Sequence, residues 1–388
     1  MFSKSHGLLN TYNTHHATKR RHALRNNSTI QNAFPKIKTV KLDTKLDFND
    51  VLIVPKKTSI ASRKDVSLSR EIKFDNDVVW KGTPIISSNM DTVSDLETFN
   101  ILKGYNYITC FPKSFNKHWL YFSEVPIELM YSNNYMLSCG VSKDEINILI
   151  SLIHRLNDKN IVVKFVCLDV ANGYMASLGE ASLELRKRFP NMVIVAGNVV
   201  TPEVTCNLIA NYGVNIVKIG IGSGSVCTTR LKTGVGYPQL SAVLECGKAA
   251  HDAGGYIISD GGIVHPCDIA KALGAGADFV MCGSIFACHE ESPGTTFEDS
   301  LTQTKLKRFY GMSSEIANNK YNNGLQNYRT TEGKEVACKI KGSLHDTIKD
   351  INGSLRSTCS YTNSSTIGEL YKNTKFIQVL HHHNTSYE

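Results

Sequence analysis

A cysteine in a glycine-rich segment is the residue of this sequence best suited to covalent chemistry. Cys227 follows glycines at positions 220, 222 and 224, and Thr228, Thr229 and Arg230 come directly after it. Glycines let a backbone approach a ligand or an ion closely, and hydroxyl groups and a cation beside a thiol favour its reactive thiolate form. A buried cysteine in a turn is the plainer alternative, but the flanking Gly and Thr residues offer no apolar packing. The segment therefore predicts that Cys227 is a nucleophile.

Two later segments have the composition of a phosphate-binding edge. Residues 257–262 have the sequence IISDGG and residues 280–286 have the sequence VMCGSIF. In parallel α/β barrels, the loops after the seventh and eighth strands commonly hold a phosphate on backbone N–H groups. Asp260 could accept hydrogen bonds from sugar hydroxyls, and its alternative role is a helix N-cap. The predicted phosphate donors are Ser225, Gly262, Gly283 and Ser284.

A long polar stretch, residues 290–341, contains the third group of candidate residues. Residues 309–314 have the sequence FYGMSS, and residues 328–333 have the sequence YRTTEG. A long polar insertion in a compact domain is usually a functional lid or is disordered. We expect the first segment to cover a base and a phosphate, and Arg329 and Glu332 of the second to fold over the site. The alternative is that these charged residues are simply solvated.

Eight short apolar segments, each followed by a helix-like stretch, can position these residues. The segments are continuous rather than alternating, which is typical of parallel strands buried on both faces. Eight such units predict an α/β fold, a (β/α)8 barrel, rather than an open doubly wound sheet. Strands are expected in residues 84–90, 107–111, 135–140, 164–171, 193–199, 215–222, 256–262 and 278–286. Helices are expected in residues 181–189, 202–212, 239–253, 266–275, 344–355 and 366–372, with a last strand in 376–380.

Polar residues gather where the expected strands end. Because the carboxyl ends of barrel strands form the catalytic face, these residues are predicted to lie around one site. They are residues 88–91, Asp169, Asn172, Asn198, residues 223–225, Asp260, Gly283 and Ser284.

Charge is distributed unevenly along the 388 residues, whose formal net charge is +8. Residues 1–42 contain basic residues but no Asp or Glu, so the remainder is close to balanced. We predict a flexible tail over residues 1–42 and a single barrel domain over residues 43–388. A transit peptide and a nucleic-acid-binding patch are the alternatives for the tail. The expected location is the cytoplasm, or an organelle if the tail is a targeting segment.

Cysteine usage and hydropathy narrow the class of protein further. The eleven cysteines include no C-x-x-C pair, and Cys110, Cys139, Cys167 and Cys282 lie inside apolar runs. This pattern predicts small buried side chains rather than a disulfide framework or a zinc site. No apolar run approaches the length of a membrane span. Neither a membrane nor a nucleic acid is an expected partner.

Many ordered segments together resemble the IMP dehydrogenase/GMP reductase family over roughly residues 46–385. They include LDFNDVLIVPK, ISSNMDTV, CLDVANGY, AGNVVT, GSVCTTRLKTGVGYPQLSAV, GAGADFVM and RSTCSY, besides IISDGG and FYGMSS. The run CTTRLKTGVGYPQL, the DVANGY segment and FYGMSS are closer to the reductases. No segment fits the pair of CBS modules that the dehydrogenases typically carry. Their catalytic Arg-Tyr pair is also missing, because Tyr328 precedes Arg329 here.

The resemblance implies an NADPH-dependent conversion of GMP to IMP with release of ammonia. Cys227 would attack C2 of the purine and form a covalent thioimidate, which hydride from NADPH would then resolve. Thr229 and Glu332 would relay the proton that the leaving amine needs.

The resemblance also implies the binding residues. GMP or IMP would contact Ser225, Asp260, Gly261, Gly262, Gly283, Ser284, Gly311, Met312, Ser313, Arg329, Thr330, Thr331 and Gly333. NADPH would contact Ser62, Arg63, Lys113, Asp169, Val170, Ala171, Met312, Tyr328, Arg329, Ser357, Thr358, Cys359 and Ser360. A monovalent cation, K⁺, would be held by backbone carbonyls of Gly222, Gly224 and Cys227, with Arg230 as a further ligand. The implied assembly is a homotetramer.

Two departures from the family pattern affect these expectations. Ser223 stands where family members usually have Pro, and Pro112 precedes Lys113 where reductases have His. Two other functions stay open at this point. One is an IMP dehydrogenase without CBS modules that makes XMP with NAD⁺, and the other is a non-enzymatic binder that acts through the tail.

Overall fold

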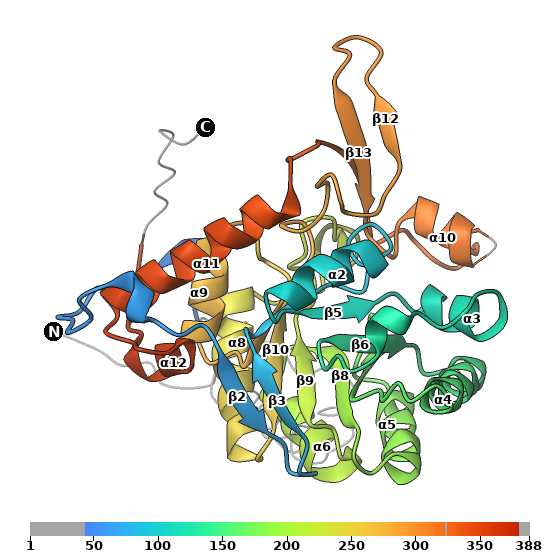
Figure 1. Ribbon diagram of the computed structural model, residues 1–388, viewed down its shortest axis with the longest axis horizontal. Helices are drawn as coiled ribbons and strands as arrows, with labels where there is room; N and C mark the ends of the chain where they lie inside the picture. Colours follow the sequence, from blue (N-terminus) through green and yellow to red (C-terminus); the bar gives the residue numbers. More distant parts are fainter. Residues whose placement is uncertain (1–42, 323, 380–388) are drawn as a thin grey trace, which may run out of the picture. The chain divides into compact units, whose positions relative to one another are not determined.

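Eight parallel strands close into a barrel in a computed structural model that describes residues 43–322 and 324–379. The predicted tail, residues 1–42, lies outside the described residues. Figure 1 shows the strands surrounded by helices. In barrel order the strands are β4 (Ile85–Ser87), β5 (Ile108–Phe111), β6 (Tyr135–Cys139), β7 (Phe165–Asp169), β8 (Val193–Val199), β9 (Ile216–Ile219), β10 (Tyr256–Asp260) and β11 (Phe279–Cys282). The predicted (β/α)8 barrel is therefore confirmed, and each predicted apolar run contains one strand.

Helices follow the strands along the chain and cover the outside of the barrel. They are α2 (Leu96–Gly104), α3 (Ser114–Tyr121), α4 (Lys143–Asn157), α5 (Ala176–Arg188), α6 (Pro202–Tyr212), α8 (Gln239–Asp252) and α9 (Pro266–Gly274). A short helix, α7 (Thr229–Thr233), lies in the loop after β9. Helix α5 begins at Ala176, earlier than predicted, because small and polar residues obscure the periodicity of its first turn. From β4 to β11 the chain is described throughout and contains no inserted domain, as the prediction of no CBS module requires.

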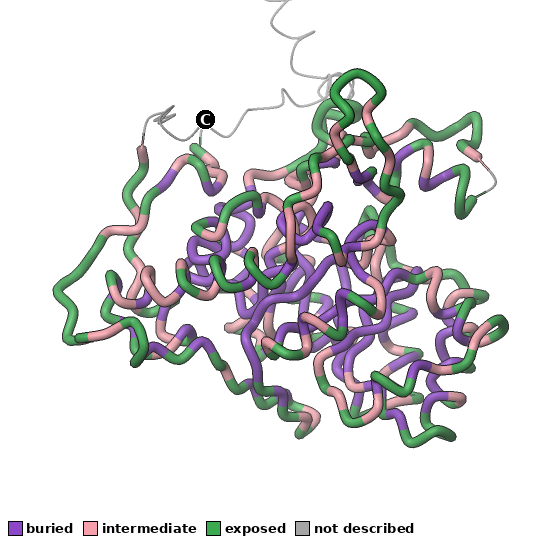
Figure 2. Tube along the Cα trace, turned by 45° about the horizontal axis from the view of Figure 1, so that its top comes forward, coloured by how far each residue is buried: buried purple, intermediate pink, exposed green. Residues whose placement is uncertain are grey.

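Two apolar layers hold the barrel together. The outer layer lies between strands and helices, and the inner layer fills the barrel with side chains such as Ile86, Phe165 and Met281. Figure 2 shows that buried residues concentrate in the strands and on the inner sides of the helices. Strand residues are buried on both faces, which explains why the sequence shows continuous apolar runs.

A hairpin closes the amino-terminal end of the barrel. Strands β2 (Arg70–Lys73) and β3 (Val79–Gly82) pair antiparallel, and Phe74 and Trp80 join the inner layer. The Phe74 ring lies 5.9 Å from that of Phe165, and the Trp80 ring 5.0 Å from that of Phe279. Since Phe165 and Phe279 are the first residues of their strands, the opposite, carboxyl-terminal end is left for a site. We call that end the mouth.

The first and last described segments pack against the outside of the barrel. Strand β1 (Val51–Ile53) pairs with β15 (Phe376–Gln378), and helix α11 (Leu344–Tyr361) packs on α9. Helix α11 extends beyond the predicted range of 344–355, and the stretch predicted at 366–372 forms η4 (Ile367–Glu369) and α12 (Leu370–Asn373). The remaining short helices are η1 (Phe48–Asp50), η2 (Arg63–Asp65) and η3 (Ile127–Leu129).

The polar stretch of residues 290–341, which we call the flap, follows β11 and has a sheet of its own. Strands β12 (Thr296–Glu298), β13 (Lys305–Tyr310) and β14 (Glu335–Lys339) form an antiparallel sheet, and α10 (Glu315–Tyr321) lies between β13 and β14 in sequence. Figure 1 shows β12 and β13 projecting from the barrel. The buried Lys307 fixes β13 against the segment that follows β11, because its Nζ donates to backbone carbonyls of His289, Glu290 and Ser292.

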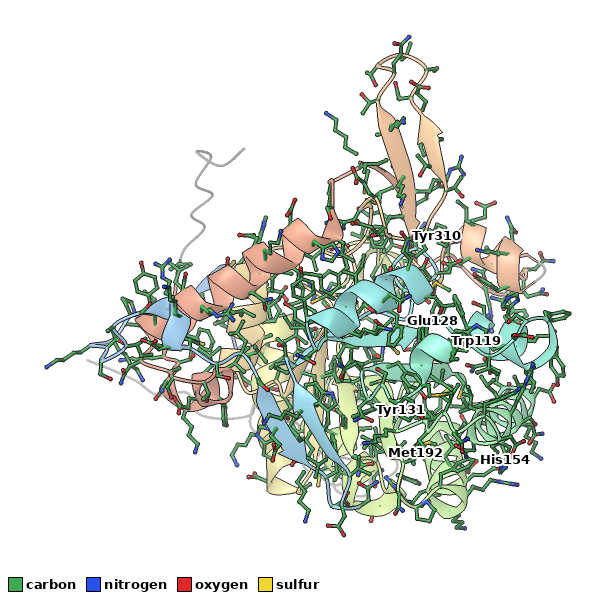
Figure 3. The ribbon with its side chains drawn as sticks, in the orientation of Figure 1. Trp119, Glu128, Tyr131, His154, Met192 and Tyr310 are labelled. Carbon is green, nitrogen blue, oxygen red and sulfur yellow. The ribbon has the colours of Figure 1, made fainter. Side chains whose placement is uncertain are left out.

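Asp91, just after β4, is a second anchor of the flap. Its Oδ2 accepts hydrogen bonds from Tyr310 Oη at 2.7 Å, Lys320 Nζ at 2.7 Å and Tyr321 Oη. Its side chain is only 7% exposed. Tyr310 lies at the base of the flap (Figure 3), and Lys320 and Tyr321 end helix α10. One carboxylate oxygen therefore holds both ends of residues 310–321 against the barrel.

All eleven cysteines are free, and the four predicted to be small core residues are buried. Over residues 43–322 and 324–379, no helix has the length and apolar character needed to cross a membrane.

We expect the pair between His251 and Asp278 to stabilise the fold most at low pH. The hydrogen bond to Asp278, at 2.9 Å, raises the pKa of His251 above its ordinary 6.5, although burial opposes the shift. Because the folded pKa is the higher one, the stabilisation is complete below pH 6.5 and is lost as pH rises through the folded pKa. His251→Gln should lower the thermal unfolding midpoint by about 1–4 °C near pH 6, and by less near pH 9. Lys248→Gln, on the exposed side of the same helix, is the control, and an equal loss at both pH values would contradict the assignment.

Asp91→Asn should loosen the flap without unfolding the barrel. The substitution weakens three hydrogen bonds to a carboxylate, so hydrogen–deuterium exchange in residues 310–321 should become about tenfold faster. Exchange in the barrel strands should not change. Glu335→Gln removes an exposed ion pair with Arg308 in the same sheet and should leave exchange in residues 310–321 as it is. Unchanged exchange in Asp91→Asn would show that Asp91 is not an anchor.

Candidate active site

Three side chains form a continuous hydrogen-bonded chain at the mouth. Cys227 Sγ donates to Thr229 Oγ1 at 3.2 Å, and Thr229 Oγ1 donates to Glu332 Oε2 at 2.7 Å. Cys227 and Thr229 come from the loop and helix after β9, whereas Glu332 comes from the flap, 103 residues beyond Thr229. All three are partly exposed. The structure therefore brings together the three residues predicted to be catalytic and leaves them accessible to a ligand.

Backbone hydrogen bonds between three loops fix this arrangement. Thr228 N donates to Glu332 O at 2.8 Å and Lys334 N donates to Val226 O at 2.9 Å, so Cys227 and Gly333 face each other as an isolated β-bridge. On its other side, the flap segment is bonded to the FYGMSS turn through Glu332 N to Ser313 O at 3.2 Å and Gly311 N to Lys334 O at 3.1 Å. The predicted substrate residues Gly311, Met312, Ser313 and Gly333 are thus placed around Cys227.

Close packing of the loops after β9 and β10 requires glycine at two positions. Gly220 has a φ of +149°, and a Cβ there would lie 1.9 Å from the carbonyl oxygen of Asp260. Gly261 has a φ of +99°, and a Cβ there would lie 2.3 Å from Ser223 Oγ. Ser223, the departure from the family pattern, donates to the same Asp260 carbonyl at 3.3 Å, a bond that proline cannot make.

The glycine loop offers backbone carbonyls of the kind that bind alkali cations. The carbonyl of Gly224 faces Cys227, whose N–H donates to it at 3.0 Å. The Arg230 guanidinium is bonded to Asp47 at 3.1 Å and to the Tyr237 carbonyl at 2.6 Å. Because a guanidinium is itself a cation and has no acceptor atom, Arg230 could join the carbonyls of Gly222, Gly224 and Cys227 only through its own backbone carbonyl. In residues 43–322 and 324–379, no group of three His, Cys, Asp or Glu side chains could hold a metal ion.

The predicted phosphate edge follows β10 and β11, the seventh and eighth barrel strands, as expected. Ser284 Oγ donates to the Ile263 carbonyl at 3.2 Å, and Gly283 lies beside Ser88. The Gly262 N–H already donates to Ser223 O at 3.0 Å. The amide of Gly262 therefore helps to shape the loop, whereas Ser225 is exposed.

A buried lysine, which the sequence analysis did not single out, links two of the predicted ligand residues. Lys218 Nζ lies 2.7 Å from Asp169 Oδ1 and 2.7 Å from Asp260 Oδ2. Asn89 donates to the other oxygen of Asp169 at 3.0 Å, and Asn198 donates to Asp260 Oδ2 at 3.0 Å. The sequence does contain a signal for these ion pairs, because a lysine inside the apolar run NIVKIGIG would be buried and would need acidic partners.

We call Lys218, Asp169, Asp260, Asn89 and Asn198 the Lys218 network. Electrostatic interactions within the network set the ionisation of Lys218 and Asp169. Burial by itself would raise the pKa of Asp169, but the charge and hydrogen bond of Lys218 outweigh it, and the pKa is lowered. Burial would likewise lower the pKa of Lys218, but Asp169 and Asp260 raise it well above its ordinary value. Lys218 is therefore an ammonium ion and Asp169 a carboxylate at neutral pH.

A cavity of about 870 Å³ opens between the carboxyl ends of β5 and β6 and the flap. Its walls include two predicted cofactor residues, Lys113 and Met312, together with Asp91 and Lys320. Lys113 precedes α3 and lies 3.6 Å from Glu145. Asp169, Val170 and Ala171 follow at the end of β7. The volume and the mixed apolar and charged lining suit part of a dinucleotide.

The other predicted cofactor residues are divided between two places. Ser62 and Arg63 adjoin η2, and residues 357–360 form the end of α11, which packs on η2. Figure 1 shows the end of α11 and helix α3 on opposite sides of the barrel, so one chain does not bring this group to the cavity. Tyr328, Arg329 and Thr330 are exposed on the flap, where Arg329 lies over the Tyr328 ring at 5.8 Å, and Thr331 is partly exposed.

Comparisons with known proteins agree with this arrangement. The model of the "IMP dehydrogenase / GMP reductase domain" family matches residues 133–385. Over 348 residues the chain is 45% identical to GMP reductase 1 of Homo sapiens, covering 89% of this chain and 98% of that protein. It is 45% identical over 343 residues to a GMP reductase of Klebsiella pneumoniae, covering 88% and 96%, and 44% identical over 350 residues to one of Caenorhabditis elegans, covering 90% and 96%. This chain therefore belongs to the IMP dehydrogenase/GMP reductase family of oxidoreductases.

Proposed function

We propose that the protein is a GMP reductase, which converts GMP to IMP and ammonia with NADPH as the reductant. The observation that carries this proposal is the hydrogen-bonded chain from Cys227 through Thr229 to Glu332 at the mouth. The three similar proteins named above, which are GMP reductases, support it. An NADPH molecule, when bound, supplies the hydride that replaces the amino group at C2 of the purine.

Cys227 acts as the nucleophile of this reaction. Its thiolate adds to C2 of GMP, and the C2–N bond then breaks, leaving a thioimidate and ammonia. Hydride addition at C2 is followed by cleavage of the C–S bond, which regenerates the thiolate and releases IMP. Dividing one difficult displacement into two steps lowers the barrier of each.

Thr229 and Glu332 move the protons that these steps need. In the chain of donors, the thiol donates to Thr229 and Thr229 donates to Glu332, so a proton that leaves Cys227 can reach the carboxylate. The carboxyl group can then protonate the 2-amino group, which leaves only as neutral ammonia. Because Glu332 belongs to the flap, a closed flap is a condition of this transfer.

The ligands are held on both sides of Cys227. Asp260 accepts hydrogen bonds from the ribose of GMP, and the edge after β10 and β11 holds its phosphate. Asp169 and the cavity beside Lys113 take the nicotinamide side of NADPH. We propose that residues 62–63 and 357–360 of a second copy, within a homotetramer, take the remainder of the cofactor. The carbonyls of Gly222, Gly224 and Cys227 would hold K⁺.

A spectrophotometric assay tests the proposed reaction. GMP should cause loss of NADPH absorbance and formation of ammonia and IMP in equal amounts. The competing function, an IMP dehydrogenase, predicts IMP-dependent formation of NADH and XMP instead. Absence of NADPH oxidation with GMP would exclude the proposed function.

Cys227→Ala should remove turnover completely but keep GMP binding within about threefold, because a nucleophile stabilises the covalent intermediate rather than the ground state. Calorimetry measures the binding, and mass spectrometry of wild-type protein with GMP should detect the covalent adduct. Cys206→Ala, which changes an exposed cysteine on α6, is the control. Residual turnover in Cys227→Ala would remove Cys227 from the mechanism.

Thr229→Val and Glu332→Gln should each lower kcat by about 10²–10⁴ with little change in KM for GMP. The double variant should lose about as much as either single variant, because both residues belong to one relay. Thr302→Val, at the exposed tip of the flap, should behave as wild type. Multiplicative losses in the double variant would show that the two residues act independently.

A further inference from the structure

Lys218 is a buried cation in the barrel wall that no step of the proposed reaction uses. It lies in β9 between the fully buried Val217 and Ile219, and it is itself 3% exposed. A buried ammonium loses its hydration and must be compensated by close opposite charges. Lys218 has two, one from β7 and one from β10.

The two carboxylates differ in the surface that they leave for a ligand. Asp169 uses both oxygens, one toward Lys218 and one toward Asn89, and its side chain is 29% exposed. Asp260 uses Oδ2 for Lys218 and Asn198, and its Oδ1 accepts no hydrogen bond from any residue that the structure describes. A bonded oxygen fixes the orientation of this carboxylate, while the other oxygen is left for a hydroxyl group of a ligand.

Four consecutive strands of the barrel supply this arrangement. Asp169, Asn198, Lys218 and Asp260 come from β7, β8, β9 and β10 in turn. The ammonium lies deeper than the carboxylates, which are partly exposed at the mouth. Movement of either carboxylate would therefore change the environment of the other through the shared cation.

We infer that Lys218 is a positioning residue that holds the carboxylates of Asp169 and Asp260 in fixed orientations, so that one cation serves both the cofactor side and the substrate side of the site. This inference rests on the proposed function, which assigns Asp169 to the cofactor and Asp260 to the ribose of GMP. It predicts that a single substitution at Lys218 weakens the binding of both nucleotides, although Lys218 contacts neither of them.

The side chains around the Lys218 network determine which groups can titrate in the pH range of the test. Asn89 and Asn198 are neutral, and burial raises the pKa of the Cys110 and Cys282 thiols well above neutrality. Lys113 is a more distant positive charge that acts on Asp169. The charged and titratable groups facing Lys218 itself are Asp169, Asp260, Cys167 and Cys110, and the Cys139 thiol faces Asp169. Without Lys218, the two carboxylates would repel each other, and one of them would bind a proton at a higher pH than before.

The test compares full-length wild-type protein with Lys218→Met, which keeps the length of the side chain and removes its charge. Calorimetry gives Kd for GMP and for NADPH between about pH 6 and pH 8.5. We expect both Kd values to rise about tenfold near pH 6. At each pH, the Kd of the variant is divided by the Kd of wild type. Both ratios should fall as pH rises, because the carboxylates of the variant then ionise. The ratio cancels the titration of the nucleotide phosphates.

Two further variants separate this role from damage to the fold. Arg186→Met removes another partly buried cation, which donates to the Met192 and Gly213 carbonyls at the amino-terminal end of β8 and β9, and should change neither Kd. The double variant Lys218→Met with Asp169→Asn removes one charge of each sign, so it should fold even if Lys218→Met does not. In the double variant, GMP affinity should recover to within about threefold of wild type, whereas NADPH affinity should stay weak.

The outcomes distinguish the inference from the proposed function. If wild type binds both nucleotides and Lys218→Met binds them equally well, or loses only one of them, Lys218 is not a shared positioning residue and the proposed function stands. A loss that is independent of pH, or that also appears in Arg186→Met, would reduce Lys218 to a structural role. If wild type binds neither nucleotide, the proposed function and this inference both fall.

Discussion

Pairing of the flap with the loop after β9 is the interaction on which the site depends. Two backbone hydrogen bonds, from Thr228 to Glu332 and from Lys334 to Val226, join segments more than a hundred residues apart in sequence. Without this bridge, Glu332 would be an exposed flap carboxylate and Thr229 a hydroxyl with no acceptor. The bridge also makes the proposed relay conditional, because Cys227 belongs to the loop after β9, whereas Glu332 belongs to the flap, which is held by a few anchors. In the proposed reaction, the flap would open for ligand exchange and close for chemistry by breaking and re-forming this one set of contacts.

The flap is attached strongly at its base and weakly at its tip. Lys307, with three backbone carbonyls, and Asp91, with three side-chain donors, are both buried or nearly so, and they fix β13 and α10. The tip between β12 and β13 is exposed, and residues 328–330 make few contacts. A firm base gives the FYGMSS turn a defined place beside Cys227, while exposed residues such as Tyr328 and Arg329 remain free to meet a ligand or a second copy.

How far the sequence predicts this structure depends on the range of the interactions involved. Strands such as residues 193–199 could be predicted because a strand buried on both faces has an unbroken apolar sequence. Cys227 stood out because its glycine and threonine neighbours are adjacent in the chain. The sheet inside the flap was not foreseen, since strands exposed on one side and rich in lysine resemble a loop. Lys218 was missed because its role depends on contacts with Asp169 and Asp260, and these residues come together only when the barrel closes. Glu332 was found by resemblance alone, and its position depends on the long-range bridge.

Barrel geometry accounts for the proposed role of one lysine toward two ligands. In a closed parallel barrel, neighbouring strands deliver their last residues to a common rim, and a residue one layer deeper lies under the gap between them. Lys218 on β9 is the more buried residue, with 4% of its side chain exposed, while Asp169 on β7 and Asp260 on β10 are 29% and 20% exposed. A hydride can pass between two nucleotides only if both are held in register to within about half an ångström. Carboxylates that share one buried cation keep a fixed separation, because neither can move without losing its charge partner. If the two nucleotides bind as proposed, the charge buried in the wall of the barrel constrains the distance between them.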